Sequence, residues 1–250
     1  MWATGIVVVL LVVLWLTPRR VARLVTVDGK DIGPAPAGSP TWQVGWEPAG
    51  PIEVEAADGG ESVDLIAPRL VSEGQLLFLT RRGPDGQMDI FRSQLNEGSW
   101  SRAVPVAEIN SGANDIGPVV SSDGLTLYFF SNRAGGHGGY DLYVSRRRGS
   151  TWTPPKNLGD AINSPANEFD PALAPDGLDL FFASDRSGAD PDRLPEWTAT
   201  IRRPLEGPDF DLYRASRESI EDAFASVRPL EGLNRTDSHE GAPFVSPGGG

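Results

Sequence analysis

The stretch SNRAGGHGGYDLY, residues 131–143, combines residue types that often carry out chemistry. Four glycines surround His137, and Asp141 follows them. A glycine-rich loop binds phosphate through its backbone amides when a helix begins directly after it. A histidine near a carboxylate can transfer protons. These residues raise two functional hypotheses, a phosphate-binding loop and an acid–base pair, which compete with a turn between two strands.

The composition limits the classes of function. The chain has 250 residues, enough for one large domain or two small ones. Its 34 acidic and 22 basic residues give a net charge of −12, so we expect no nucleic-acid partner. The absence of cysteine excludes disulfides, thiolate nucleophiles and cysteine-ligated metals. The 29 glycines and 22 prolines predict many tight turns and no long helices in the body of the chain.

The amino-terminal segment is strongly apolar. Residues 5–16, GIVVVLLVVLWL, lie in a run from Met1 to Pro18 without any charged side chain. A helix of this length reaches about 27 Å, slightly less than a hydrocarbon core of about 30 Å. We therefore expect a hydrophobic helix at 1–20 that anchors the protein in a membrane, with a cleaved signal or a mis-set start as alternatives. Positive charges follow the segment, at Arg19, Arg20 and Arg23, which would place the following flank in the cytoplasm.

Residues 21–62 are rich in proline, glycine and alanine and predict a linker with short β pieces. Residues 63–250 repeat three elements in a fixed order. The first element is a proline, a short apolar strand, a turn with glycine and a second apolar strand, starting at Pro68, Pro118, Pro171 and Pro243. The second element is DIFRSQ (89–94), DLYVSR (141–146) and DLYRAS (211–216). The third is an aromatic residue, Trp100, Trp152 or Phe224, before EINSGAND (108–115), AINSPANE (161–168) and GLNRTDSH (232–239).

Each element predicts β-structure. The unbroken apolar runs are short and bounded by turns, which favours strands buried on both faces. The Asp-Gly pairs at 123–124 and 176–177 supply the positive φ that a tight hairpin needs, and the repeated proline suits the first residue of a strand. A unit of about 50 residues with four strands is typical of a propeller blade. The sequence predicts an all-β fold with blades at 64–113, 114–166 and 167–237 and the start of another at 238–250.

Residues 121–186, SSDGLTLYFFSNR through LFFASDR, resemble the TolB-type, WD40-like β-propeller repeat of bacterial envelope and secreted proteins. Weaker copies extend the resemblance from about Asp64 to Gly250. The resemblance implies the fold more strongly than a function, because such propellers serve as protein-binding platforms, envelope scaffolds and accessory domains beside enzymes. Propellers close with about 4 to 8 blades, whereas about three are present, so we expect a partial propeller in a truncated sequence or blades supplied by another chain.

The repeat predicts that the glycine-rich stretch is a hairpin loop, because it occupies the place of RRGPDGQM (81–88) in the preceding repeat and a strand follows it. We expect His137 to be a surface residue. Asp141 recurs as Asp89 and Asp211, which favours a structural hydrogen bond over catalysis.

Other candidate residues also repeat or lack a motif. Arg133 and Arg186, with Arg82 as a looser match, predict pairing between blades in preference to a ligand-binding rim. We expect no metal site, because Asp185, Asp190 and Asp192 lack the spacing of a calcium loop. SRRRGSTW (145–152) resembles the structural Asp-box of sialidase-type propellers, with Arg147 in place of the aspartate. No serine-hydrolase elbow, metalloprotease motif or P-loop is present, so we expect no catalytic residues and no cofactor.

One segment breaks the repeat. Residues 188–210 are an insertion where the preceding repeat has only its glycine loop, and long loops on rigid scaffolds often carry function. We therefore predict a non-enzymatic propeller of the cell envelope, membrane-anchored or exported to the periplasm or beyond, that binds a protein or saccharide ligand. The resemblance implies that its repeats lie outside the cytoplasm, the side opposite to the one that the charges after the first segment favour. Its candidate binding residues are Trp197, Arg202 and Arg203. The alternatives are an accessory propeller of a peptidase or glycosidase whose catalytic part lies beyond residue 250, and a structural arc completed by a partner.

Overall fold

The computed structural model describes residues 25–27, 30–32, 65–71, 74–186, 210–235 and 238–245. Every regular secondary-structure element within these ranges is a β-strand, which confirms the predicted all-β class. No helix in them is long and apolar enough to cross a membrane. The predicted hydrophobic helix at 1–20 lies outside the described residues.

A small hairpin lies in a unit of its own, Val8–Glu53. Its strands are β1 (Val25–Val27) and β2 (Lys30–Ile32). They pair antiparallel, with Val25 opposite Ile32. The hairpin falls inside the segment that the sequence predicts to be a linker with short β pieces.

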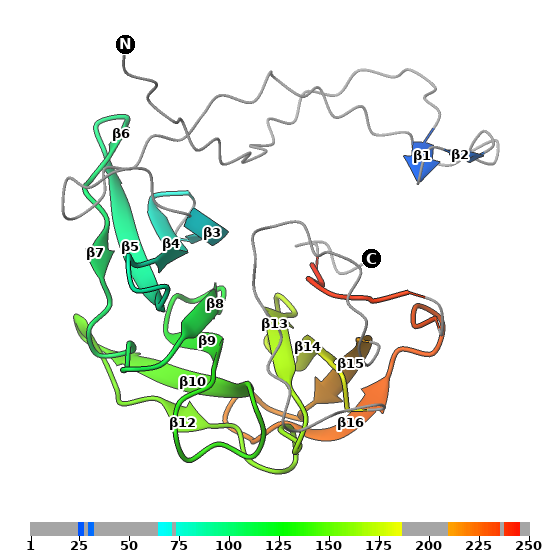
Figure 1. Ribbon diagram of the computed structural model, residues 1–250. Coiled ribbons are helices and arrows are strands. Elements are labelled where there is room, and N and C mark those ends of the chain that lie inside the picture. The colour runs from blue at the N-terminus through cyan, green and yellow to red at the C-terminus, as the bar shows by residue number, and fades with distance from the viewer. Residues whose placement is uncertain are drawn as a thin grey trace. The chain divides into compact units, whose positions relative to one another are not determined.

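The other strands form three antiparallel sheets in chain order, which we refer to as blades 1, 2 and 3 (Figure 1). Blade 1 consists of β3 (Leu65–Val71), β4 (Leu76–Arg82), β5 (Met88–Asn96), β6 (Ser99–Trp100) and β7 (Val104–Pro105). Blade 2 consists of β8 (Asp115–Val120), β9 (Thr126–Ser131), β10 (Asp141–Arg148), β11 (Thr151–Trp152) and β12 (Lys156–Asn157). Blade 3 consists of β13 (Glu168–Leu173), β14 (Asp179–Ser184), β15 (Asp211–Ser216) and β16 (Ala225–Pro229). In each blade neighbouring strands pair in sequence order, and in blades 1 and 2 the outermost position is shared by two short strands.

The turns between the first and second strands of the blades have the conformation that the sequence predicts. Gly74, Gly124 and Gly177 have φ values of 86°, 73° and 73°, the left-handed region that glycine adopts without strain. In blade 2 the Asp123 carboxylate accepts a hydrogen bond from the Leu125 amide at 2.8 Å and closes the turn. The predicted turn chemistry is therefore confirmed.

The repeated proline does not begin its strand, and that prediction is wrong. Pro118 is the fourth residue of β8 and lies within a β-bulge between Ile116 and Val119. Gly117, inside the bulge, has a φ of 65°. The bulge opens the hydrogen-bond ladder, so a proline is accommodated there without loss of a ladder donor. The bulge residues of the other blades also have a positive φ: Ala67 at 48° and Asp170 at 46°.

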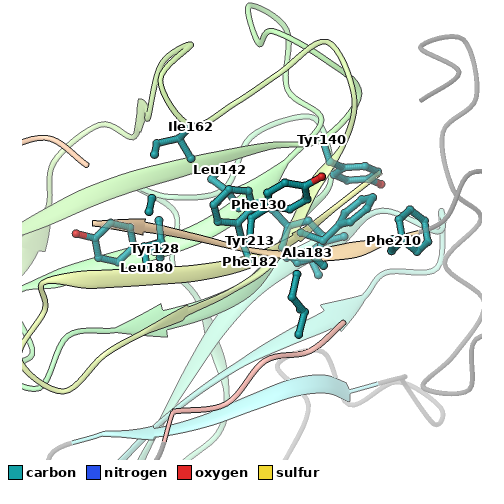
Figure 2. Packing of buried hydrophobic residues seen from close by; sticks show 14 of the residues in the cluster. Tyr128, Phe130, Tyr140, Leu142, Ile162, Leu180, Phe182, Ala183, Phe210 and Tyr213 are labelled. Carbon is teal, nitrogen blue, oxygen red and sulfur yellow. The ribbon is translucent and has the colours of Figure 1, made fainter. Parts of the chain in front are cut away.

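The core lies between the blades. One cluster joins side chains of blades 1 and 2, among them Phe78, Ile90, Leu127 and Phe129. A second cluster gathers residues of blades 2 and 3 with a few from blade 1. Figure 2 shows the labelled members of this second cluster: Tyr128, Phe130, Tyr140, Leu142, Ile162, Leu180, Phe182, Ala183, Phe210 and Tyr213.

The recurring aromatic of the third element joins each blade to the one before it. Trp152 of blade 2 packs edge-on against Phe78 of blade 1, with ring centroids 6.2 Å apart. Phe224 of blade 3 packs in the same way against Tyr128 of blade 2, at 6.1 Å. These contacts assign the recurring aromatic residue to the packing of one blade against the next. They also explain why the aromatic is needed once per blade, because a blade buries its faces only against its neighbours.

Candidate functional site

The chemistry-bearing residues collect at one edge of the three sheets, which we refer to as the loop edge. It consists of the connections between second and third strands: 83–87, 132–140 and 185–210. The first strands also start at this edge, because Asp115 lies opposite Ser131 and Glu168 lies opposite Ser184.

In blade 2 an arginine binds a fully buried carboxylate at the loop edge. The Nη2 of Arg133 lies 2.5 Å from Asp115 Oδ1, and the Asp115 side chain is 0% exposed. The same nitrogen donates to the carbonyl of Ile109 at 2.8 Å, while Nε donates to Ser131 Oγ. The guanidinium lies over the ring of Tyr143, 4.9 Å from its centroid, which adds a cation–π contact.

Blade 3 repeats the arrangement with a glutamate. Arg186 Nη2 lies 3.0 Å from Glu168 Oε1 and 2.7 Å from the carbonyl of Ile162. Its guanidinium lies 4.7 Å from the centroid of Tyr213. Ser164 donates to Glu168 from its backbone amide and its hydroxyl. Burial raises the pKa of Glu168, and the hydrogen bonds from Ser164 and the charge of Arg186 oppose that shift.

These arginines differ in part from the prediction of pairing between blades. Each carboxylate belongs to the arginine's own blade, and the hydrogen bond to Ile109 or Ile162 is the contact with the connection from the preceding blade. Because both groups of the ion pair are largely buried, removing either one would leave an uncompensated charge, at a cost of about 3–5 kcal/mol. The clusters therefore hold the first strand of a blade to its second.

Blade 1 places its arginine differently. The register aligns Gly83 with Arg133, so Arg82 is not the equivalent residue that the sequence predicts. Arg81 takes over the stacking contact instead, with its guanidinium 5.2 Å from the centroid of Phe91. The spacing of the repeat does not predict this contact. Arg81 lies two residues before Gly83, the position equivalent to Arg133, and its long side chain reaches the aromatic ring from there.

The glycine-rich loop of blade 2 is a hairpin loop, as predicted, and β10 follows it directly. Asp141 is buried, and its carboxylate accepts hydrogen bonds from the amides of His137 and Gly138 and from Asn157 Nδ2. A Cβ on Gly138 would lie 1.9 Å from the carbonyl oxygen of Ala166, so only glycine fits this close approach. The His137 side chain is exposed. The loop amides thus bind the protein's own carboxylate rather than a phosphate.

The related Asp89 of blade 1 is half-buried and accepts a hydrogen bond from Gln87 Nε2 at 3.2 Å. Burial raises the pKa of Asp89, against the effect of the Gln87 hydrogen bond. Both aspartates therefore stabilise the loops that precede them, as the repeat predicts.

A set of asparagines was missed by the sequence reasoning. The side chain of Asn163 spans the backbone of Leu142, accepting from its amide at 2.8 Å and donating to its carbonyl at 3.0 Å. Asn110 forms the same pair with Ile90, and Asn234 forms it with Leu212. The sequence did contain a signal for these residues, because each is the third residue of one copy of the third repeated element. An amide side chain provides a donor and an acceptor in one plane and so imitates a strand partner.

The insertion begins and ends at buried residues of blade 3. Asp185 accepts hydrogen bonds from the amide and the Nδ2 of Asn167 at 2.8 and 2.9 Å. At the other end, the ring of Phe210 packs edge-on against Phe169, with centroids 5.3 Å apart. Both ends are therefore fixed to the sheet at the loop edge. The predicted binding residues Trp197, Arg202 and Arg203 lie outside the described residues, as do Asp190 and Asp192.

No group of three or more histidine or acidic side chains in the described ranges could hold a metal ion. A hollow of about 580 Å³ lies beside β16 and is lined by Arg228, Pro229, Leu230, Glu231, Gly232 and Leu233. These residues are consecutive in the chain, and no polar groups converge on the hollow from other elements.

The strand order and packing define the class of protein: successive antiparallel blades, each with four strand positions, of the kind that builds β-propellers. A scan against protein-family models found no match, and a search of curated proteins found none. Solved structures similar to this chain include TolB from Acinetobacter baumannii, at 16% identity and a TM-score of 0.46 over 75% of this chain and 36% of that one. A putative TolB from Agrobacterium tumefaciens matches at 15% identity and a TM-score of 0.38, over 78% of this chain and 70% of that one.

A puromycin-hydrolyzing peptidase from Mycobacterium tuberculosis is also similar, at 14% identity and a TM-score of 0.43, over 73% of this chain and 25% of that one. This chain therefore spans about a third of the Acinetobacter TolB and a quarter of the peptidase. The strand order of the three blades agrees with the propeller fold that the resemblance to TolB-type repeats implies.

Proposed function

We propose that this protein is a non-enzymatic binding platform of the cell envelope, membrane-anchored or exported, whose insertion at 188–210 contacts a protein or saccharide ligand. The observation that carries the proposal is the attachment of the insertion at both ends. Asp185 is bonded to Asn167, and Phe210 is buried against Phe169. The connection that contains the insertion therefore starts and ends at buried residues of the loop edge, beside the other connections of this edge.

The polar clusters of the loop edge support a binding function over catalysis. Asp115, Glu168 and Asp141 already accept hydrogen bonds from the protein's own side chains and amides. Asp141 recurs as Asp89 and Asp211, and Glu168 of blade 3 takes the position of Asp115 in blade 2, as expected for parts of the scaffold. The insertion is the part of the loop edge that the repeat does not account for, and Trp197, Arg202 and Arg203 belong to residue types enriched in binding hot spots.

The chain supplies its own control for a test. Arg133 and Tyr140 flank residues 134–139 in blade 2 as Arg186 and Phe210 flank 187–209 in blade 3. Replacing 187–209 with the sequence AGGHGG should therefore remove the insertion and keep both attachment points. The native protein and this variant would be compared in affinity capture from envelope extracts and on glycan arrays, and any captured component would then be titrated as a purified probe.

We expect the native protein to bind a component that the loop-replaced variant does not bind, and Trp197→Ala to weaken that binding at least tenfold. Equal binding by both proteins would refute the role of the insertion. Turnover of a peptide or glycoside by the native protein would favour the hydrolase alternative. Protease accessibility in intact cells would test the extracytoplasmic location.

A further inference from the structure

A histidine replaces asparagine at one repeated position of the loop edge. In blade 1 the Met88 amide donates to Asn114 Oδ1 at 3.0 Å, and in blade 2 the Tyr140 amide donates to Asn167 Oδ1 at 3.0 Å. In blade 3 the Phe210 amide donates to His239 Nδ1 at 3.1 Å. The donors are equivalent, since each is the residue just before or at the start of the third strand.

The two acceptor types respond differently to pH. An asparagine oxygen accepts at every physiological pH, whereas an imidazole nitrogen accepts only while it carries no proton. The Phe210 amide can only donate, so Nδ1 must be the unprotonated nitrogen in this arrangement. Histidine is also the side chain that most readily gains a charge between about pH 5 and 8.

We propose that His239 is a pH-sensitive latch that holds Ser238–Val245 against the point where the insertion rejoins blade 3. In the neutral form, Nδ1 accepts from Phe210 and the two rings pack 5.2 Å apart. In the protonated form, an Nδ1–H would face the Phe210 N–H, and two donors cannot share this position. The proposal concerns the attachment of the chain and does not depend on the proposed binding function.

Two further contacts hold the same segment. The Glu240 amide donates to the carbonyl of Phe210 at 2.7 Å, and the Ala242 amide donates to Asp170 Oδ2 at 3.1 Å. Loss of the histidine contact therefore weakens the attachment without removing it, so the latch adjusts the opening of the segment rather than unfolding the blade.

Other ionisable groups belong to the elements that pack here. Glu240 accepts from Ser238 Oγ at 2.6 Å and from the Arg235 amide at 3.3 Å. Asp211 follows Phe210 at the start of β15, and the Arg235 side chain belongs to the connection that leads to the segment. Asp170 lies in β13. Asp185 and Arg186, at the start of the insertion, are bonded to Asn167 and Glu168. A substitution of His239 alone separates its titration from that of these groups.

Amide hydrogen exchange of the full chain, followed residue by residue with NMR, tests the proposal. We expect the protection factor of the Phe210 amide to fall about tenfold between about pH 7.5 and 5.5, the size of one lost hydrogen bond. The Met88 and Tyr140 amides are internal controls, because their acceptors are asparagines, and their protection factors should stay constant. His239→Asn places the residue of the other two repeats at this position, so the variant should fold and lose the fall at Phe210.

Two results would overturn the latch. One is a Phe210 protection factor in the native protein that does not change over this range of pH. The other is an equal fall in His239→Asn, which would assign the effect to Asp170, Glu240 or Asp211. An equal fall in the protection factors of the Met88 and Tyr140 amides would indicate that all three blades become less stable at low pH, and would contradict an effect confined to His239.

Discussion

Replacing Asn163 with alanine should destabilise the protein, because this side chain takes the place of a strand partner for β10. Asn163 belongs to a connection between blades, yet its side chain is buried and completes the hydrogen bonding of β10. Alanine removes the acceptor of the Leu142 amide and one donor to the Leu142 carbonyl.

The size of the effect follows from what each group retains. The Leu142 carbonyl still accepts from the Leu158 amide at 3.0 Å, so it loses one bond of two, worth about 1 kcal/mol. The Leu142 amide would be left without its acceptor in a residue that is 0% exposed, at a cost of about 1–3 kcal/mol. The expected loss in the free energy of unfolding is therefore about 2–4 kcal/mol.

Urea denaturation monitored by circular dichroism and tryptophan fluorescence would measure the loss, provided that the slope with urea is unchanged. Asn234→Ala is the matched control. Asn234 makes the same two bonds to Leu212 but is only half-buried, so water can replace them and we expect a loss below about 1 kcal/mol. A loss below about 0.5 kcal/mol for Asn163→Ala, or equal losses in both variants, would refute the reasoning.

Three further predictions follow from the blades. Trp152→Ala removes the contact with Phe78 between blades 1 and 2 and should cost about 3–5 kcal/mol in chemical denaturation, whereas Trp152→Phe should cost less. Gly138→Ala should lower the melting temperature because its Cβ would overlap a carbonyl oxygen of the connection to blade 3, while Gly112→Ala, with nothing within 4 Å, should not. The raised pKa of Glu168 means that the folded protein keeps this proton to a higher pH than the unfolded chain does. Its contribution to stability is therefore present at low pH and lost as the pH rises from 4.5 towards the folded value, and Glu168→Gln should abolish that part of the pH dependence of the urea midpoint.

The hairpins of the fold could be predicted from the sequence, because their signals are local. The apolar runs ending at Ser131 and Ser184 and the turn glycines Gly124 and Gly177 specify strand, turn and strand within about ten residues. The packing of Trp152 could also be predicted, since an aromatic that keeps register with the repeat serves the contact that each repeat makes.

The features that the sequence did not predict depend on the geometry of the backbone and on the direction in which side chains extend. The position of Pro118 within β8 depends on a bulge, and a bulge depends on how two strands meet rather than on one strand's composition. The stacking of Arg81 in place of Arg82 depends on the direction of a side chain. The asparagine of each third element was visible in the sequence, but its partner is a backbone group about twenty residues away, which no pattern of side chains identifies.

The bulge and proline of the first strands have a consequence for the behaviour of the protein at high concentration. Among the described strands, β3, β8 and β13 each pair on one side only, so the other side of each forms no ladder with a described strand and is an edge of its sheet. Pro68, Pro118 and Pro171 interrupt each of these edges with a ring that cannot donate and a kink that departs from a flat ribbon. Each of these three first strands thus carries a proline at the edge of its sheet, and we expect replacement of the prolines to make pairing with a foreign strand easier there.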